Sequence, residues 1–295
     1  MIVPNLGEVP DGIEGILCSF SANDGAFESF SATSSAKSQN IPSIPSDRYI
    51  RHTTFAPIGE HGQQLIEQAR VAIIGLGALG SNSADLLARA GVGFLRIIDR
   101  DHVSLSNLPR CSLYTEQDAA DAIPKAIAAK SHLSKINSEI TIEEVNIDVN
   151  TSNIESLIAD VDIVVDATDN FKTRYLLNEA CHKLKKPWVY AGVLAGFGAT
   201  MVVSPRGPCF KCLAPTQPHD NNDFDCETYG VFSSVPVILA ALQVVSVIKY
   251  IVGGPVIPGR YVAIDIWNMT LDEIDIAQNP NCPCCMREEY DCLGA

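Results

Sequence analysis

Hydrophobic and polar positions alternate along the middle of the chain in blocks that predict strands followed by helices. Short apolar runs, rich in β-branched residues, have the length of buried strands at 71–74, 94–98, 140–146 and 161–167. Apolar positions at helical spacing lie between and after them, at 83–90, 124–136 and 172–184. Strands that alternate with helices need crossover connections. The pattern therefore predicts a Rossmann-like α/β fold, in which a mostly parallel sheet is covered by helices on both faces.

Beyond residue 188 the pattern changes to strands that pair with their neighbours. The predicted strands are 189–193, 199–204 and 261–267, and they indicate an antiparallel extension of the sheet. A long apolar helix near 235–252 interrupts them. Its length suggests a membrane span, but polar residues are rare in true spans and this run contains Ser233, Ser234, Pro236, Gln243, Ser246 and Lys249. We therefore expect a buried or subunit-interface helix and no membrane contact.

Residues 1–46 form a segment of different composition. They are rich in Ser, Gly, Pro and Asn, and the first Lys or Arg of the chain is Lys37. We interpret them as a flexible N-terminal arm, either a disordered tail or a segment that docks on a partner subunit or substrate, and residues 47–295 as the folded domain. Because signal and transit peptides carry positive charges near their start, the sequence indicates a cytoplasmic protein.

Composition and charge narrow the class of protein. Of the 295 residues, 46% are apolar and 19% are charged, which is typical of a folded globular chain. The net charge is −14, so a broad nucleic-acid or anionic-membrane surface is disfavoured, and an anionic ligand must be held by a few specific cations. The ten cysteines, in a reducing compartment, indicate metal or thiol chemistry rather than disulfides.

A glycine-rich turn predicts a nucleotide site. Gly75, Gly77 and Gly80 follow the first strand and open a helix, so that the backbone can approach a phosphate and the helix N-terminus faces the anion. Asp99 ends the next strand, where a carboxylate can accept hydrogen bonds from ribose hydroxyls. The pattern alone leaves ATP and a dinucleotide such as NAD open.

Charged residues near other strand ends point to phosphate chemistry. Arg110 and Lys125 are cations that could neutralise a triphosphate, and Asp169 follows the strand at 161–167, where a carboxylate could hold Mg2+. Each charge taken singly is more often a solvated surface group. Their shared place beyond the carboxyl ends of strands, where doubly wound sheets bind ligands, favours a site.

Two cysteine pairs have the spacing of a tetrahedral zinc site. Cys209 and Cys212 form one pair and Cys282 and Cys285 the other, so together they can supply four thiolates. A closed site of this kind is structural, and it would tie the C-terminal part of the chain to the sheet. Redox-active pairs and unrelated buried thiols are the alternatives, and Cys284 could replace a neighbouring ligand.

Cys226 stands in a polar loop just before the long helix. The N-terminus of a helix activates a thiol, whereas the flanking Asp225 and Glu227 oppose that effect. A covalent role and a bystander role are therefore both open.

Several motifs between residues 48 and 286 together resemble the ThiF/MoeB family of adenylyltransferases, which are related to ubiquitin-activating enzymes. In chain order they are Arg48-Tyr49-Ile50-Arg51, the glycine turn at 75–80, the stretch 99–110, the tetrad 167–170 and the two cysteine pairs. The resemblance implies ATP-dependent adenylation of the C-terminal glycine of a small ubiquitin-like sulfur carrier that ends in Gly-Gly, with release of pyrophosphate. The setting would be thiolation for thiamin, molybdopterin or tRNA.

The resemblance also implies roles for residues of the site. Asp99 would bind the ribose, Asp169 would bind the magnesium, and the phosphates would be bound by Asn107, Arg110 and Lys125. A carboxylate is already ionised near pH 7, so the reaction needs no general base.

Two further implications concern other molecules. Arg51 would reach into the neighbouring subunit's site, so that a homodimer would be needed for activity. Cys226 would match a position at which some members carry a thiol that captures the activated carrier, as a thioester or a persulfide-derived adduct. A sulfur donor protein would then be a further partner.

The sequence departs from the family pattern at His52, Pro109 and Cys111, and in its Ser-rich arm. Pro109 fixes φ and removes a donor, so we expect the loop that bears Arg110 to be held somewhat differently. A close rival is therefore a relative that adenylates a ribosomal peptide, with the arm as its clamp. An NAD-dependent dehydrogenase shares the glycine turn but leaves the cations and the cysteine pairs unexplained. A non-catalytic binding module is the third alternative.

Overall fold

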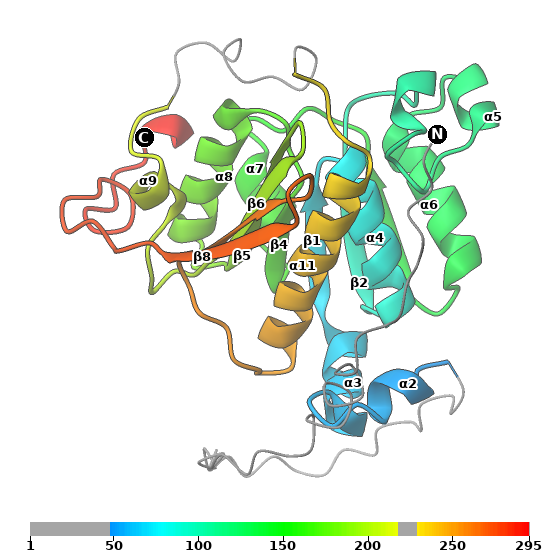
Figure 1. Ribbon diagram of the computed structural model, residues 1–295, viewed down its shortest axis with the longest axis horizontal. Helices are drawn as coiled ribbons and strands as arrows, with labels where there is room; N and C mark the ends of the chain where they lie inside the picture. The colour runs from blue at the N-terminus through cyan, green and yellow to red at the C-terminus, as the bar shows by residue number, and fades with distance from the viewer. Residues whose placement is uncertain (1–47, 218–228, 295) are drawn as a thin grey trace, which may run out of the picture. The chain divides into compact units, whose positions relative to one another are not determined.

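One sheet of eight strands underlies the part of the chain that the structure describes, residues 48–217 and 229–294 (Figure 1). The structure is a computed structural model, and its strands lie in the order β3-β2-β1-β4-β5-β6-β7-β8. Their bounds are β1 Arg70–Ile74, β2 Phe94–Ile98, β3 Thr141–Val145, β4 Ile163–Asp166, β5 Trp188–Leu194, β6 Phe197–Val203, β7 Arg260–Asp265 and β8 Thr270–Asp275. The arm expected at 1–46 and Cys226 lie outside the described residues.

The sheet has a parallel part and an antiparallel part. Strands β3, β2, β1, β4 and β5 pair in parallel, and β6, β7 and β8 continue the sheet in antiparallel pairs. The predicted α/β fold with its antiparallel extension is confirmed. The pattern of the sequence did not predict β8, which lies at the end of the sheet.

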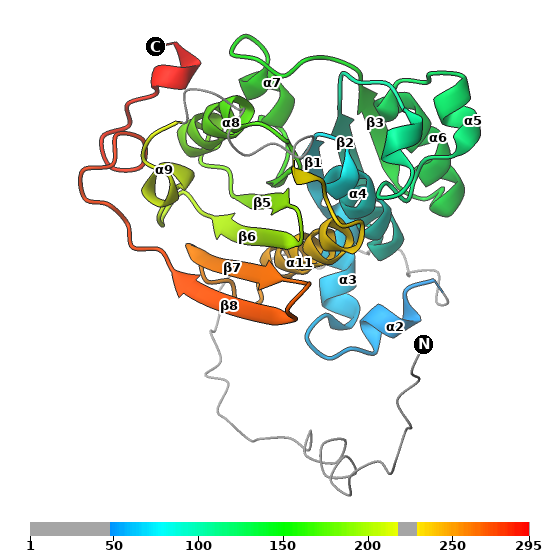
Figure 2. The same cartoon turned by 45° about the horizontal axis from the view of Figure 1, so that its top comes forward.

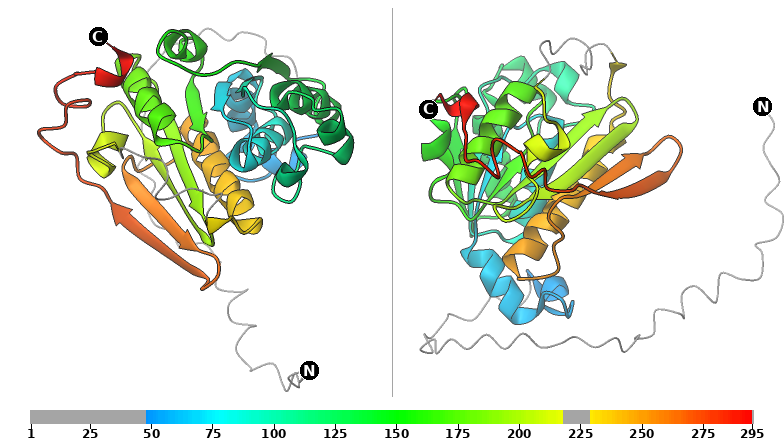
Figure 3. Two further views of the ribbon diagram at one scale, coloured as in Figure 1. Left: turned by 90° about the horizontal axis from the view of Figure 1, so that it is seen from above. Right: turned by 90° about the vertical axis from the view of Figure 1, so that its left-hand side faces the viewer.

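Helices cover both faces of the sheet, as expected. On one face lie α4 (Ala78–Ala90), α6 (Lys125–Ile136) and α11 (Ser234–Ile251), and on the other lie α7 (Ile154–Ile158), α8 (Phe171–Lys183) and α9 (Phe210–Leu213). Figure 3 shows α8 in green and α11 in gold on opposite sides of the strands. The remaining elements are α2 (Ile50–Thr53), α3 (Gly59–Gln68), α5 (Glu116–Ala120) and the 3-10 turns η1 (Leu105–Asn107) and η3 (Asp291–Leu293).

Alternate side chains of the central strands enter two separate cores. In β1, Val71 and Ile73 pack with the α4 and α11 side, whereas Ala72 and Ile74 pack with the α8 side. All four are at most 1% exposed. A strand buried on both faces has no need of polar positions, which explains the continuous apolar run in the sequence.

The long apolar helix α11 is a core helix of the described fold. It is long and apolar enough to cross a membrane by length and composition, yet 44% of its residues are buried in the protein. It packs against α4, β5 and β6, and buried Gln243 donates hydrogen bonds to the backbone oxygens of Asp166 and Val189 at 2.7 and 3.1 Å. This packing agrees with the expected buried helix.

The strand order fixes where a ligand can bind. Strand β1 pairs with β2 on one side and with β4 on the other, so the chain reverses its direction of winding at β1. In doubly wound sheets a crevice forms at such a point, outside the carboxyl ends of the strands. Figure 2 brings this end of the sheet toward the viewer.

Candidate active site

A cavity of about 1050 Å³ lies at the carboxyl ends of β1, β2 and β4. It is lined by most of the residues that the sequence singled out: Gly75, Gly77, Asp99, Asn107, Arg110, Lys125 and Asp169. Gly80 and Arg51 are not among its described lining residues. One cavity therefore joins residues that are far apart in the sequence.

The glycine turn between β1 and α4 depends on the absence of side chains. Gly75 has φ of +92°, and a Cβ atom there would lie 2.6 Å from the backbone oxygen of Ala167. A Cβ atom on Gly80 would lie 1.9 Å from the oxygen of Gly75. These two glycines let the turn fold tightly against the next strand end, so that the N-terminus of α4 faces the cavity.

Asp99 holds the glycine turn as well as lining the cavity. Its Oδ2 accepts a hydrogen bond from the backbone amide of Leu76 at 2.6 Å, and its Oδ1 accepts one from the amide of Asp101 at 2.8 Å. Burial raises the pKa of Asp99, and the charge of Lys125 opposes this effect. Each carboxylate oxygen has a second lone pair, so the contacts are compatible with the expected ribose hydrogen bonds.

Lys125 brings a buried positive charge to the cavity. It begins α6, and its side chain is 9% exposed. Its Nζ lies 3.0 Å from Oδ2 of Asp101 and 4.0 Å from Oδ2 of Asp99. Since the two carboxylates hold the ammonium group in place, the group is already positioned before a ligand binds.

Arg110 and Asn107 line the same cavity from the loop after β2. The Nη1 of Arg110 donates to the backbone oxygen of Ser106 at 2.5 Å, and Oδ1 of Asn107 accepts from the amide of Ser104 at 3.0 Å. The backbone oxygen of Arg110 accepts from Nδ2 of Asn82 in α4 at 3.0 Å. The loop that contains Pro109 therefore presents Arg110 to the cavity, where the sequence placed it.

Asp169 lies on the loop between β4 and α8. The next residue, Asn170, caps α8 by accepting a hydrogen bond from the amide of Thr173 at 2.9 Å, and its Nδ2 donates to Oδ1 of Asp169 at 3.3 Å. Asp169 is exposed and lines the cavity. A carboxylate in this position can ligate a divalent cation.

A buried ion pair that sequence reasoning missed supports this loop. Asp166 is fully buried, and its Oδ2 accepts from Nε of Arg174 at 3.1 Å. Arg174 also donates through Nη2 to the backbone oxygens of Thr168 at 2.5 Å and Ala191 at 3.1 Å. Burial raises the pKa of Asp166, while the Arg174 guanidinium favours its charged form. The signal in the sequence that could have indicated this ion pair is Arg174, a basic residue on the buried side of α8.

Replacing Arg174 with Met is expected to lower the free energy of unfolding by about 3–5 kcal/mol, because the buried Asp166 keeps its hydrogen bonds from Thr168 but loses its cation. Urea unfolding measures the change. The control is Arg89→Met, which removes an exposed arginine that pairs with Asp85 within α4 and is expected to cost less than about 0.5 kcal/mol. Equal losses in the two variants would contradict a supporting role for Arg174.

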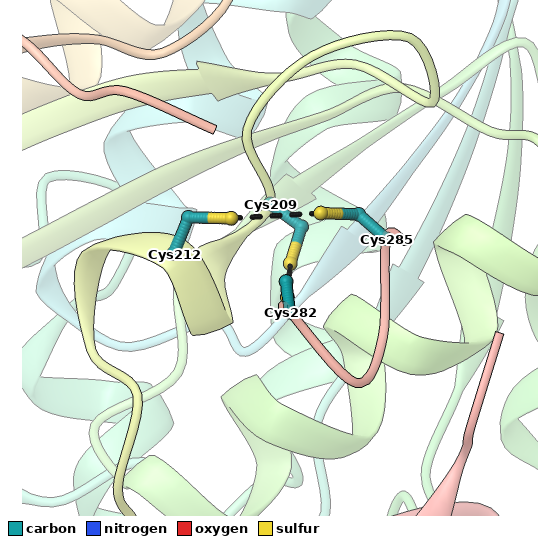
Figure 4. Close-up of side chains that lie close together, drawn as sticks. All are labelled: Cys209, Cys212, Cys282 and Cys285. Atoms are coloured by element: carbon teal, nitrogen blue, oxygen red, sulfur yellow. Dashed lines mark hydrogen bonds between the residues drawn. The ribbon is translucent and has the colours of Figure 1, made fainter. Parts of the chain in front are cut away.

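The two cysteine pairs meet on the face of the sheet that α8 and α9 cover, and they lie together as the sequence predicts (Figure 4). The sulfur atoms of Cys209, Cys212, Cys282 and Cys285 all lie within 4.8 Å of one another. Sγ atoms are 3.5 Å apart in the pairs Cys209–Cys282 and Cys212–Cys285. Four sulfurs bound tetrahedrally to zinc are roughly 3.8 Å apart, since the Zn–S bond is about 2.3 Å. The cluster therefore fits a zinc ion.

The surroundings of the cluster agree with a metal site. The hydrogen bond that the Cys212 thiol donates to Cys209, together with burial, raises the pKa of Cys212, so the thiolates need a cation to balance their charge. Cys284 is also buried, but its Sγ accepts from Nδ2 of Asn178 at 3.3 Å and it is not part of the four-sulfur cluster. The geometry thus favours Cys285 as the fourth ligand.

Arg51 lies on α2, away from the cavity of its own chain. Helix α2 precedes α3, which leads into the N-terminal end of β1, whereas the cavity lies at the carboxyl end of that strand. The nearby His52 contacts Oε1 of Gln63 through its Nδ1 at 3.1 Å. The distance of Arg51 from its own cavity is compatible with the expectation that it acts elsewhere.

The fold and the site define a nucleotide-binding α/β protein whose cavity is suited to an anionic ligand. Comparison with known proteins narrows this class, because the family model described as the ThiF family matches residues 49–284. The chain belongs to the ThiF family. The resemblance in the motifs of the sequence is confirmed.

Individual relatives agree with the family. The chain is similar to the Sulfur carrier protein ThiS adenylyltransferase of Bacillus subtilis, with 39% identity over 250 residues, 84% of this chain and 74% of the relative. It is 35% identical to the SAMP-activating enzyme E1 of Haloferax volcanii over 240 residues, 81% of this chain and 88% of the relative. The crystal structure of E. coli MccB with AMPCPP and MccA matches with a TM-score of 0.73 at 24% identity, over 83% of this chain and 75% of that one, and shows the same fold.

Proposed function

We propose that the protein uses ATP to adenylate the C-terminal glycine carboxylate of a small ubiquitin-like sulfur carrier, with release of pyrophosphate. The observation that carries the proposal is a cavity lined by a glycine turn, two cations and an acidic loop, in a chain 39% identical to a relative named for this activity. ATP supplies the adenylyl group, and the carrier supplies a carboxylate that is ionised near pH 7.

The reaction joins two negative groups, and the residues of the cavity reduce their repulsion. One oxygen of the carrier carboxylate attacks the α-phosphorus of ATP, and the bond from that phosphorus to the oxygen that bridges to the β-phosphate breaks. The electron pair leaves with pyrophosphate. Arg110 and Lys125 would neutralise the phosphates, and because both are held by protein atoms beforehand, little reorganisation opposes the reaction. Asn107 and the amide groups at the start of α4 would orient the same phosphates.

Two metal ions belong to the proposal. Mg2+ would bind at Asp169, where it would supply further positive charge at the phosphates. Zn2+ would be held by Cys209, Cys212, Cys282 and Cys285, with a structural role, because four thiolates leave no open coordination position. A cytoplasmic location would suit the zinc site, because its thiolates stay reduced in a reducing compartment.

We propose further that the active form is a homodimer in which Arg51 serves the partner's cavity. In support, Arg51 does not line the cavity of its own chain among the described residues. A cation from the second copy would add to Arg110 and Lys125 at the phosphates. Cys226 and a sulfur donor protein would act after adenylation, in transfer of the activated carrier.

Mixing two inactive variants tests the shared site. Arg51→Ala and Asp169→Ala are each expected to be inactive, and co-refolding them in equal amounts is expected to restore about one quarter of the intact activity. Half of the dimers are then mixed, and each mixed dimer has one complete site. Pyrophosphate exchange measures the recovery. No recovery in a mixture whose mixed dimers are demonstrated by mass spectrometry would contradict the shared site.

Exchange of labelled pyrophosphate into ATP tests the main proposal. Small proteins that end in Gly-Gly, including Bacillus subtilis ThiS, are added in turn with MgATP, and exchange is expected only with a carrier whose last glycine is intact. A ribosomal peptide as the active substrate would favour the peptide-modifying alternative. Binding of NADH but not of ATP in a calorimeter would favour the dehydrogenase. Exchange that survives Asp169→Ala would remove the proposed role of that residue.

A further inference from the structure

The chain returns to the cavity after the cysteine cluster. Residues 286–294 run from the last cysteine pair back to α8, where they end in the short turn η3. Figures 2 and 3 show this red turn beside α8. Asp291 and Cys292 line the same cavity as Gly75 and Lys125. The C-terminal segment is thus one wall of the candidate active site.

A single buried carboxylate holds this segment. Glu179 of α8 is 0% exposed, and its Oε2 accepts hydrogen bonds from the backbone amides of Cys292 at 2.8 Å and Leu293 at 3.1 Å. Its Oε1 accepts from Nζ of Lys211 at 2.6 Å. The amide of Leu293 also donates to the backbone oxygen of Tyr290 at 3.1 Å, so the carboxylate adds to the turn's own hydrogen bond. A carboxylate that binds two successive amides fixes the turn beside α8.

The same carboxylate connects the segment with the cysteine cluster. Lys211 lies between Cys209 and Cys212 in sequence and is 7% exposed. A second contact holds the segment, because Nδ1 of His182 on α8 lies 3.1 Å from the hydroxyl of Tyr290. The proposed chemistry uses none of Glu179, Lys211 and Tyr290, yet their contacts converge on one wall of the cavity.

The wall lies on the α8 side of the cavity, away from the phosphate cations. Arg110 and Lys125 come from the β2 side of β1, whereas α8 follows β4 on the other side. Asp291 of the wall and Lys172 of α8 both line this side of the cavity, so it carries charges of both signs. The cavity, at about 1050 Å³, reaches the upper end of the usual range for one small ligand. The α8 side of the cavity therefore has room for the extended peptide segment that carries the reacting carboxylate.

We propose that residues 290–293 form part of the binding site for the carrier's C-terminal segment, and that Glu179 is the positioning residue that holds them there. This inference rests on the proposed function. Loss of the wall weakens contacts to the carrier and leaves the contacts to ATP in place.

Two variants and a control test the inference. Truncation after Glu289 removes the wall but keeps the Glu179–Lys211 pair, whereas Glu179→Gln keeps the wall and removes its anchor. Both are expected to raise the KM for the Gly-Gly carrier that is active in the exchange assay by about tenfold, while the Kd for MgATP in calorimetry changes by less than about twofold. The control is Glu289→Gln, an exposed residue of the same segment, and it is expected to change neither.

Amide hydrogen exchange gives a readout that needs no carrier. In Glu179→Gln the amides of 290–293 are expected to exchange at least about tenfold faster than in the intact chain. Unchanged hydrogen exchange of these amides in Glu179→Gln would overturn the anchoring role of Glu179. An unchanged KM for the carrier in the truncated chain would overturn the role of residues 290–293 in carrier binding. A loss of MgATP affinity as large as the rise in carrier KM would also overturn the role in carrier binding. If the intact chain binds MgATP but no carrier supports pyrophosphate exchange, the proposed function fails. Hydrogen exchange of the amides of 290–293 still tests whether Glu179 holds them.

Discussion

Substitution of Lys125 with Met is expected to lower the rate of pyrophosphate exchange by about a thousandfold, because a positioned charge at the transferring group contributes two to three orders of magnitude. The effect has a second source. Lys125 lies 3.0 Å from Asp101 and 4.0 Å from Asp99, so its loss leaves two carboxylates beside the phosphates. Because the charge of Lys125 lowers the pKa of Asp99, that pKa is expected to rise in the variant.

The control for this variant lies on the same helix. Lys130 of α6 pairs with Glu144 at the surface, and its side chain is 41% exposed. Lys130→Met is expected to keep the rate of exchange within about twofold, since exposed ion pairs contribute little. Circular dichroism establishes that both variants are folded. A rate loss below about tenfold in folded Lys125→Met would contradict its role at the phosphates.

Loss of the proposed zinc ion is expected to unfold the C-terminal part of the protein. Structural zinc contributes roughly 10–16 kcal/mol to the folding of zinc-finger peptides, which is as large as the stability of a whole domain. The cluster joins α9 to the segment that begins at Cys282, a residue that is 0% exposed. Cys282→Ser, or a strong chelator with the intact chain, is expected to lower the midpoint of thermal unfolding by more than about 10 °C.

A matched variant distinguishes the metal ligand from its neighbour. Metal analysis is expected to find one zinc per chain in Cys284→Ser and much less in Cys285→Ser, because the sulfur of Cys284 is not part of the four-sulfur cluster. Retention of zinc by Cys285→Ser together with its loss from Cys284→Ser would show that the ligands are shifted by one residue. A chain free of zinc with an unchanged melting temperature would contradict the structural role.

Periodicity predicted most of the sheet but not its last strand. Strands such as β1 and β4 are buried on both faces, so their sequences are continuous apolar runs. Strand β8 has the sequence TLDEID and is exposed along its whole length, so no buried face left a pattern to detect. Its pairing with β7 follows from the turn and the neighbouring strand, which act only in the folded chain.

The site was predictable where its residues follow strand ends. The glycine turn, Asp99 and Asp169 each stand directly beyond a predicted strand, and parallel strands bring such positions together. The ion pairs Asp166–Arg174 and Glu179–Lys211 were not predictable, because each joins buried charges whose partner depends on how α8 packs. The sequence shows that such residues are charged and does not show which pairs form.

The outermost strand affects how copies of this protein meet. Strand β8 pairs with β7 alone among the described strands, so one row of its backbone donors and acceptors remains open. Such a row invites another chain to add a strand. Three of its six residues are acidic, and Glu273 and Asp275 pair with Arg260 of β7 at 2.9 Å, so β8 carries more negative than positive charge. Charged side chains on an edge strand disfavour the addition of a further strand. The charged side chains of β8 are therefore a feature of the kind that limits edge-to-edge aggregation of open sheets.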